Sequence, residues 1–512
     1  MPKSYDLPQN AIASVQGPSH GIHITVGTLQ GFAASSLSLP TGIVTAAFLS
    51  RILGPANYGA LTVAASIIVW VELTITMGFS RAAVKFVAEA DDWRSVSTRF
   101  FQVQLMVSVL AALILVTVAP VLASWLDSAE LSDYLRLFSL GIPFSALFSI
   151  HQSILVGRGY FGSRAFLIAT YWLCRMVLIF LFVGLWPSVA SAIIALISAH
   201  ALVFMGSRFF VNPALLGNSD LSFNNLWDFA LPLFFYAVGI SLFNRLDLFF
   251  VKGLLRTPDS AGFYGAAQNL TIVPSLFMAS LSPLLLSKLT WLCSQDQEAS
   301  AKAMIQKAIR LTFSLLPFAG MAAGASAEVV AMIYGNSFLP AGRILAILIF
   351  ASLGVSMIVV SSTAIIAAGR PELTFYLILP VVVFAVGAHY VFVPRFGTIG
   401  AAGVTTALSW FGACCYMLAV YRIWGVRLPD STILRSITIC VLAYVFASSW
   451  HTPGFLLLLK LPIISIIIIF AIVLLGEFSG DEVAFVRSVF NWRSRMNQNH
   501  GEKQKEQDHK SY

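Results

Sequence analysis

The sequence predicts an all-α polytopic membrane protein with about 14 transmembrane helices, arranged as two pseudo-repeated six-helix bundles plus two C-terminal helices. Of the 512 residues, 58% are hydrophobic and 11% are charged, and the mean hydropathy is +0.83. Soluble domains carry about 25% charged residues, so this composition indicates a chain that lies mostly in lipid. The connections between apolar segments are at most about 25 residues long, which leaves no room for a soluble catalytic domain.

Apolar segments long enough to cross a bilayer as helices recur along the whole chain. They cover residues 24–50, 58–80, 100–125, 135–157, 164–186, 189–210, 229–253, 264–287, 311–333, 343–366, 373–393, 398–421, 433–449 and 454–476. Lys and Arg are concentrated in the loops after even-numbered segments and in both tails. Because cytoplasmic loops carry an excess of these residues, we expect an even number of spans, with both termini in the cytoplasm.

Two pairs of similar strings indicate that the first twelve segments are a tandem duplication. RILGPANYGA (Arg51–Ala60) follows the first segment, and RTPDSAGFYGA (Arg256–Ala266) follows the seventh. VGRGYFG (Val156–Gly162) precedes the fifth segment, and AAGRPEL (Ala367–Leu373) precedes the eleventh. Such parallel repeats typically enclose a central site between two bundles. The predicted organisation is a cytoplasmic tail at 1–21, an N-terminal six-helix bundle at 22–211, a cytoplasmic linker at 212–228, a C-terminal six-helix bundle at 229–425, two extra helices at 426–476 and a basic cytoplasmic tail at 477–512.

The apolar segment Leu231–Leu255 carries Asn244, Arg245 and Asp247 near its middle. A charge at the bilayer centre costs about 2.5–3.5 kcal/mol on insertion scales, so such residues usually face the interior of a bundle or a wet cavity. Arg245 and Asp247 are two positions apart and point in different directions from a helix, so each needs a partner on another helix. We interpret this segment as part of a solute path; a buried ion pair that fixes helix packing is the alternative.

Polar residues within the other apolar segments extend this candidate cavity. The predicted substrate path consists of Arg245, Arg175, Asn244, Gln268 and Asn269. Arginine suits a phosphate group because its charge persists and its guanidinium can donate two hydrogen bonds to oxygen. The candidates for ion coupling are Asp247 and Glu72, since a carboxylate in a medium of low dielectric constant can bind and release a proton or another cation.

Other intramembrane features are expected to be structural. Glu328 and Lys460 lie near segment ends, where their side chains can extend to the membrane surface. His389, like the other histidines within apolar segments, is isolated, which is typical of a hydrogen-bonded core residue. GMAAG (Gly320–Gly324) is typical of close helix packing. The sequence has neither a P-loop nor an HExxH motif, so we expect no nucleotide, metal or other cofactor and no enzymatic activity.

Six strings follow one another in a defined order across residues 24–425: SRILGPANYGAL, MGFSRAAVKFVAE, NRLDLFF, DSAGFYGAAQNL, GRPEL and FGTIGAAGVTTAL. Together they resemble the polysaccharide-exporting flippases of the multidrug/oligosaccharidyl-lipid/polysaccharide superfamily. This resemblance implies a V-shaped pair of bundles in a bacterial inner (plasma) membrane. It implies that the protein flips an undecaprenyl-diphosphate-linked oligosaccharide from the cytoplasmic to the periplasmic leaflet by alternating access.

The resemblance also implies a role in O-antigen, capsule or exopolysaccharide biosynthesis. The expected partners are the lipid-linked oligosaccharide, H+ or Na+ as a coupling ion, membrane lipids, and polysaccharide polymerase and chain-length machinery; no nucleic acid is expected. Arg51 and Arg256, which open the two similar strings after the first and seventh segments, are assigned to a gate or loop.

Three alternative functions remain open at this point. The first is a cation-coupled multidrug exporter of the same superfamily, although a cationic drug favours an acidic cavity and Arg245 argues against it. The second is a lipid II flippase, whose SR-x-LG string matches Ser50–Gly54, but whose following arginine is replaced here by Asn57. The third is a membrane polysaccharide polymerase, which typically needs a longer periplasmic loop than this chain has.

Overall fold

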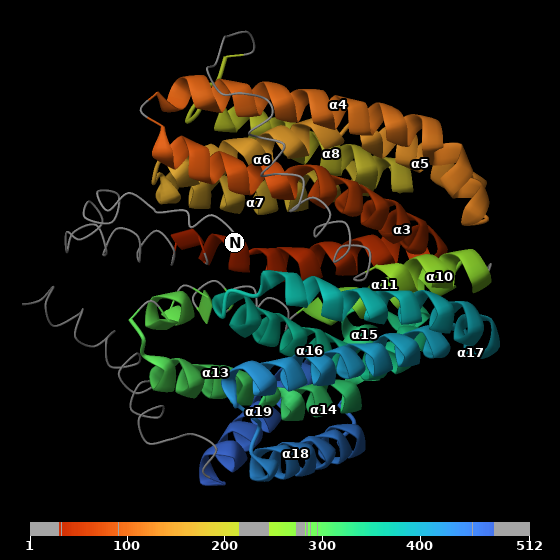
Figure 1. Ribbon diagram of the computed structural model, residues 1–512. Coiled ribbons are helices and arrows are strands. Elements are labelled where there is room, and N and C mark those ends of the chain that lie inside the picture. The colour runs from red at the N-terminus through yellow and green to blue at the C-terminus, as the bar shows by residue number, and fades with distance from the viewer. Residues whose placement is uncertain are drawn as a thin grey trace, which may run out of the picture.

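The computed structural model is built from helices, with no strand in the parts of the chain that it describes. Those parts are residues 30–31, 33–90, 92–214, 245–255, 257–272, 282, 285–286, 288–293, 295–452 and 454–475. Figure 1 shows the helices of residues 38–207 together on one side and those of residues 246–424 together on the other. The predicted tails, most of the linker, Asn244 and Arg256 lie outside the described residues.

In the N-terminal half, the structure describes six helices of at least 11 residues. They are α3 (Ser38–Glu89), α4 (Trp93–Trp125), α5 (Ala129–Ser139), α6 (Ile142–Gly157), α7 (Phe161–Leu185) and α8 (Val189–Ser207). The two predicted segments at 24–50 and 58–80 join in α3 with a sharp break instead of a loop. Gly54 has φ 72° and ψ 174° at this break, a conformation that glycine adopts without a Cβ clash, and Pro55 then starts the next helical turn.

The C-terminal half is more interrupted than the sequence predicts. Its elements are α10 (Leu246–Leu255), α11 (Ser260–Leu270), α13 (Glu298–Phe313), α14 (Leu316–Gly324), α15 (Ser326–Tyr334), η1 (Asn336–Phe338), α16 (Pro340–Ala367) and α17 (Pro371–Trp424). The predicted segment 311–333 is split among α13, α14 and α15, with a bend of 65° before α15. Helix α17 joins the predicted segments 373–393 and 398–421 across a break at Gly397, where φ is 61°.

Eight of the described helices are long and apolar enough to cross a membrane, or up to ten if each of two bent helix pairs forms one span. Two of the helical stretches that meet this test, Ala33–Thr76, which runs into α3, and Glu372–Trp424 of α17, are 44 and 53 residues long and are each broken by a glycine. A single crossing needs about 20 residues, so each of these helices is long enough to cross twice. The multi-span helical fold is therefore confirmed, whereas the exact number of 14 spans is not.

The two appended helices, α18 (Asp430–Ser449) and α19 (Leu457–Leu474), lie beside α14. A Cβ at Gly320 would lie 2.4 Å from the backbone oxygen of Cys440, and a Cβ at Gly324 would lie 2.5 Å from that of Tyr444. These two glycines therefore permit the close approach of α14 and α18. The packing role predicted for GMAAG is thus confirmed.

The prediction that Glu328 and Lys460 extend to the membrane surface is wrong. The Lys460 ammonium is fully buried and donates to Glu328 Oε2 at 2.5 Å. The Thr452 backbone N–H donates to the other oxygen of Glu328 at 3.0 Å. A buried charge is stable only when it is paired, and here α15 brings the carboxylate to the start of α19. This ion pair joins the appended helices to the C-terminal half.

Candidate substrate and ion site

A buried carboxylate on α10 is the centre of a polar network in the C-terminal half. Asp247 is 3% exposed and lies one residue after the start of α10. Its Oδ1 accepts from the Leu248 backbone N–H at 2.8 Å and from Gln268 Nε2 at 3.1 Å. Its Oδ2 accepts from the Tyr264 hydroxyl at 2.7 Å and lies 3.1 Å from Thr405 Oγ1. Residues of α10, α11 and α17 therefore converge on one carboxylate.

The side chain of Gln268 connects Arg245 to this carboxylate. Arg245 Nη1 donates to Gln268 Oε1 at 2.7 Å, while the amide nitrogen of Gln268 donates to Asp247. The sequence predicts that Arg245 and Asp247 point in different directions and need partners on another helix. Gln268 on α11 is such a partner for both of them, so Arg245 contacts the carboxylate through the Gln268 amide.

His389 and Thr405 on α17 extend the network, although the sequence alone does not predict either of them as a site residue. His389 is 2% exposed; its Nδ1 lies 2.7 Å from the Ala385 carbonyl oxygen and its Nε2 lies 3.2 Å from Thr405 Oγ1. The ring of Phe250 stacks on His389 with a centroid distance of 5.6 Å. The two residues are 16 positions apart on opposite sides of the Gly397 break, so the antiparallel arrangement of the two parts of α17 brings them together.

A second polar cluster lies in the N-terminal half. The Ser145 hydroxyl on α6 donates to the Glu72 carboxylate on α3. On α7, the Arg175 guanidinium lies 5.2 Å from the centroid of the Trp172 ring, and Tyr171 is hydrogen-bonded to Arg175. Arg175 Nε is buried and has no hydrogen-bond partner among the described residues. A buried guanidinium nitrogen without a partner is costly, and it is available to an anionic ligand.

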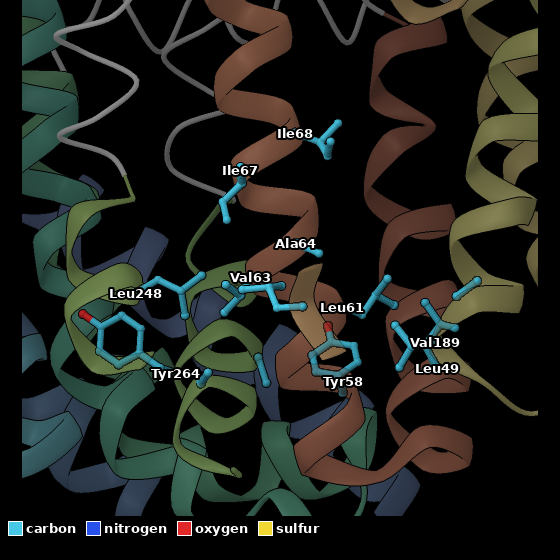
Figure 2. Packing of buried hydrophobic residues seen from close by; sticks show 14 of the residues in the cluster. Leu49, Tyr58, Leu61, Val63, Ala64, Ile67, Ile68, Val189, Leu248 and Tyr264 are labelled. Carbon is cyan, nitrogen blue, oxygen red and sulfur yellow. The ribbon is translucent and has the colours of Figure 1, made fainter. Parts of the chain in front are cut away.

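Tyr58 of α3 lies between the polar clusters of the two halves. Its hydroxyl accepts from Asn269 Nδ2 of α11 at 3.2 Å, a hydrogen bond between the two halves. Figure 2 shows Tyr58 and Tyr264 in the apolar cluster that both halves contribute to, together with Val63 and Leu248. The two arginines predicted for the substrate path come from different halves, Arg175 from α7 and Arg245 from the position immediately before α10.

The halves meet tightly near the Gly54 break. A Cβ at Gly59 would lie 2.6 Å from the backbone nitrogen of Gly262, and a Cβ at Gly262 would overlap the carbonyl of Pro55. Close by, Arg51 Nη2 donates to the Met332 carbonyl oxygen at 2.6 Å across the two halves. We name the contact of α3 with α11 around Gly59 and Gly262 the glycine junction.

Aromatic side chains surround the glycine junction. Tyr58 packs edge-on against Tyr334 and Phe338, with ring centroids 5.8 and 5.6 Å apart, and Phe263 packs against Phe338 at 5.9 Å. Tyr58, Tyr334 and Phe338 are each at most 3% exposed. The apolar rings exclude water from this end of the contact between the halves.

The structure thus brings together part of the predicted site. Arg245, Gln268 and Asp247 form one network, Asn269 donates to Tyr58 of the other half, and Arg51 donates to Met332 of the other half. In the N-terminal half, Glu72 is hydrogen-bonded to Ser145 and Arg175 lies against Trp172. Within the described residues, no group of three or more His, Cys, Asp or Glu side chains could hold a metal ion.

The fold is that of the multidrug/oligosaccharidyl-lipid/polysaccharide (MOP) transporters. The lipid II flippase MurJ in an inward closed conformation aligns with a TM-score of 0.67 at 15% identity, covering 92% of this chain and 99% of MurJ. A MOP superfamily transporter from Pyrococcus furiosus aligns with a TM-score of 0.57 at 15% identity, covering 81% and 96%. A multidrug resistance MATE family transporter aligns with a TM-score of 0.58 at 14% identity, covering 81% and 95%. These proteins of similar fold are a flippase and transporters, not enzymes.

The sequence model of the family described as "Polysaccharide biosynthesis protein" matches residues 48–343. The chain belongs to this family of polysaccharide biosynthesis proteins, which confirms the resemblance inferred from its strings. No curated protein sequence matches the chain significantly.

Proposed function

We propose that this protein flips an undecaprenyl-diphosphate-linked oligosaccharide from the cytoplasmic to the periplasmic leaflet of a bacterial inner membrane, for surface polysaccharide or exopolysaccharide biosynthesis. The observation that carries the proposal is that each half holds a largely buried arginine, Arg175 with a buried Nε that has no partner among the described residues and Arg245 hydrogen-bonded to Gln268. A diphosphate carries negative charge and several acceptor oxygens, which arginine can bind through two hydrogen bonds at once.

The two arginines differ in a way that suits a mobile anion. Arg245 is held in position by Gln268 at 2.7 Å, whereas the buried Nε of Arg175 has no partner among the described residues. An anion between them would therefore gain hydrogen bonds that the empty protein does not make. The sugars would lie among the polar and aromatic groups between the halves, while the polyprenyl tail would remain in the surrounding lipid.

Alternating access requires that the halves separate at one end of the protein at a time. With the cytoplasmic termini that the distribution of Lys and Arg favours, the Gly54 break and the glycine junction would lie on the periplasmic side. In this assignment the described conformation is closed toward the periplasm. Release of the substrate would need separation of α3 from α11. Polysaccharide polymerase and chain-length machinery would then act on the released lipid-linked oligosaccharide.

A cation-coupled multidrug exporter is the second candidate, because multidrug transporters share this fold. A cationic drug would need a carboxylate to face it. Asp247 already receives hydrogen bonds from Leu248, Gln268 and Tyr264, and Arg245 is connected to it through Gln268. This arrangement favours an anion over a cation at the boundary between the halves.

The test is an accumulation experiment in cells that lack the protein. Lipid-linked intermediates are extracted from the deletion strain and from strains complemented with the wild type, Arg245→Gln or Arg395→Gln. We expect undecaprenyl-diphosphate oligosaccharide to build up by at least about tenfold in the deletion strain and with Arg245→Gln, since the diphosphate loses a cation worth ~1.4 kcal/mol or more. Arg395 is an exposed arginine near the Gly397 break, so Arg395→Gln should restore normal levels.

Normal levels of intermediates in the deletion strain, with raised sensitivity to cationic drugs, would replace the flippase with the exporter. Full complementation by Arg245→Gln would remove Arg245 from the substrate path.

A further inference from the structure

Helix α15 is a short connection between the appended helices and the contact of the two halves. It runs from Ser326 to Tyr334 and is bent by 65° from the preceding helical segment Glu298–Gly324. In Figure 1, α15 lies between α3 of the N-terminal half and the appended helices α18 and α19. A helix of nine residues is too short to be stable by itself, so its direction depends on what holds its two ends.

The first turn of α15 is held by the appended helices. Glu328 lies in this turn, and both of its carboxylate oxygens accept hydrogen bonds. Oε2 accepts from the Lys460 ammonium at 2.5 Å and from the Thr452 hydroxyl at 3.3 Å, and Oε1 accepts from the Thr452 backbone N–H at 3.0 Å. The Lys460 side chain is fully buried, so its charge has no access to water if Glu328 moves away. The ion pair therefore fixes the start of α15 relative to α19.

The last turn of α15 is held by the N-terminal half. Carbonyl groups at the end of a helix have no helical partner, so they are available to a neighbouring element. The Arg51 guanidinium donates to the Met332 carbonyl oxygen at 2.6 Å, and the Ser50 hydroxyl lies 3.5 Å from the Tyr334 carbonyl oxygen. The ring of Tyr334 packs edge-on against Tyr58. Each of these contacts joins the two halves and must break when α3 separates from the C-terminal half.

Two apolar side chains of α15 connect the same two regions. Val329 and Met332 pack against the apolar cluster that both halves contribute to. They also pack against a second cluster, which includes Ile439 of α18 and Ile464 of α19. Protein interiors are close-packed and transmit displacements from one neighbour to the next. The position of the appended helices is therefore linked to the contact between α15 and α3.

We propose that Glu328 and Lys460 are positioning residues for transport. Their ion pair holds α15 in the orientation in which Met332 and Tyr334 bind α3, so the appended helices set how readily the halves separate at the glycine junction. An anchored α15 is already ordered when the halves meet, and this preorganisation makes the closed conformation more favourable. The pair acts through α15, and the proposal does not depend on which substrate is transported.

The test measures the distance between spin labels at Ala129 and Asp259 by electron-electron double resonance, in purified protein without glycolipid. The labels are introduced after replacement of the five native cysteines. Both positions are exposed, they belong to different halves, and neither is on α15, so the distance reports the separation of the halves. In Lys460→Met, the ratio of closed to open molecules should fall about 5- to 150-fold, the usual range of coupling between two sites.

Two further variants separate this role from a general loss of stability. Lys302→Met is the matched control, because it removes an exposed ion pair with Glu298 at 2.8 Å on α13, and it should give the wild-type distances. Arg51→Met removes the contact at the other end of α15. If the ion pair acts through this contact, adding Lys460→Met to Arg51→Met should lower the ratio further by no more than about twofold. A full additional effect would contradict the route through α15.

A folded Lys460→Met protein with the wild-type distance distribution would overturn the proposal, even if its unfolding temperature were lower, because the pair would then only stabilise the fold. If Lys460→Met does not fold, the double variant Glu328→Gln/Lys460→Met, which leaves no unpaired charge, decides. Failure of both variants to fold would assign the pair to folding and would also overturn the proposal. Because no glycolipid is used, an opened Lys460→Met protein combined with normal intermediates in the deletion strain would reject the flippase and keep the positioning pair.

Discussion

Replacing Gly262 by alanine is expected to open the glycine junction. The added Cβ would overlap the Pro55 carbonyl, which belongs to the opposite half, and the helix backbone there cannot move without separating α11 from α3. Overpacking of this kind costs about 1–3 kcal/mol. We therefore expect the ratio of closed to open molecules to fall roughly 5- to 150-fold. Gly59→Ala should act in the same direction, because its Cβ would lie 2.6 Å from the Gly262 nitrogen.

The opening can be measured by electron-electron double resonance between spin labels at the Gly54 end, at Ala129 and Ser337. The labels are introduced after replacement of the five native cysteines. Gly42→Ala is the matched control, because Gly42 also lies in α3 but a Cβ there would meet nothing within 4 Å. A distance distribution that is the same in Gly262→Ala and in Gly42→Ala would contradict the close contact of the two halves.

Replacing Arg175 by methionine is expected to reduce flipping without destabilising the folded protein. The buried Nε of Arg175 has no partner among the described residues, so its removal relieves a cost of roughly 1–3 kcal/mol, which offsets the lost hydrogen bond with Tyr171 and the lost contact with the Trp172 ring. Flipping should fall at least about tenfold because the diphosphate loses one of its two cations. Arg245→Met should also reduce flipping but should lower stability, because Gln268 Oε1 would lose its donor.

Thermal unfolding in detergent and accumulation of lipid-linked intermediates measure the two effects separately. Arg395→Met, at an exposed position, should change neither. If Arg175→Met is both less stable and inactive, Arg175 has a structural role on α7. Normal levels of intermediates with Arg175→Met would remove it from the substrate path.

The residues that could be found from the sequence are those whose presence in an apolar segment is costly. Arg245 and Asp247 stand out because charges near the middle of a span are rare, and Gln268 follows from the same argument. His389, Thr405 and Tyr264 do not stand out, because each residue type is also common in ordinary helix packing. Their role depends on which helices are neighbours, and the break at Gly397 that makes them neighbours joins two segments that the sequence shows as separate.

Two further differences between the predictions from sequence and the structure have physical causes. The sequence predicts that Glu328 and Lys460 extend to the membrane surface. In the structure, the bend before α15 and the position of α19 bring the two side chains together, and a paired buried charge has a lower free energy than two unpaired ones. The similar strings around Gly59 and Gly265 can be identified as repeats from the sequence. Their direct contact cannot be predicted, because a repeat in sequence does not specify how its copies pack. In the structure, a Cβ at Gly59 of the first copy would lie 2.6 Å from the backbone nitrogen of Gly262 in the second copy.

The most direct test of the proposed function is a translocation measurement with purified protein in proteoliposomes. The lipid-linked oligosaccharide that accumulates in the deletion strain is extracted and incorporated into both leaflets, and its exposure to an impermeant lectin is followed over time. With wild-type protein, substrate from the inner leaflet should become accessible to the lectin, and Arg245→Gln should behave as protein-free vesicles do. Equal rates in wild-type and protein-free vesicles would contradict the flippase.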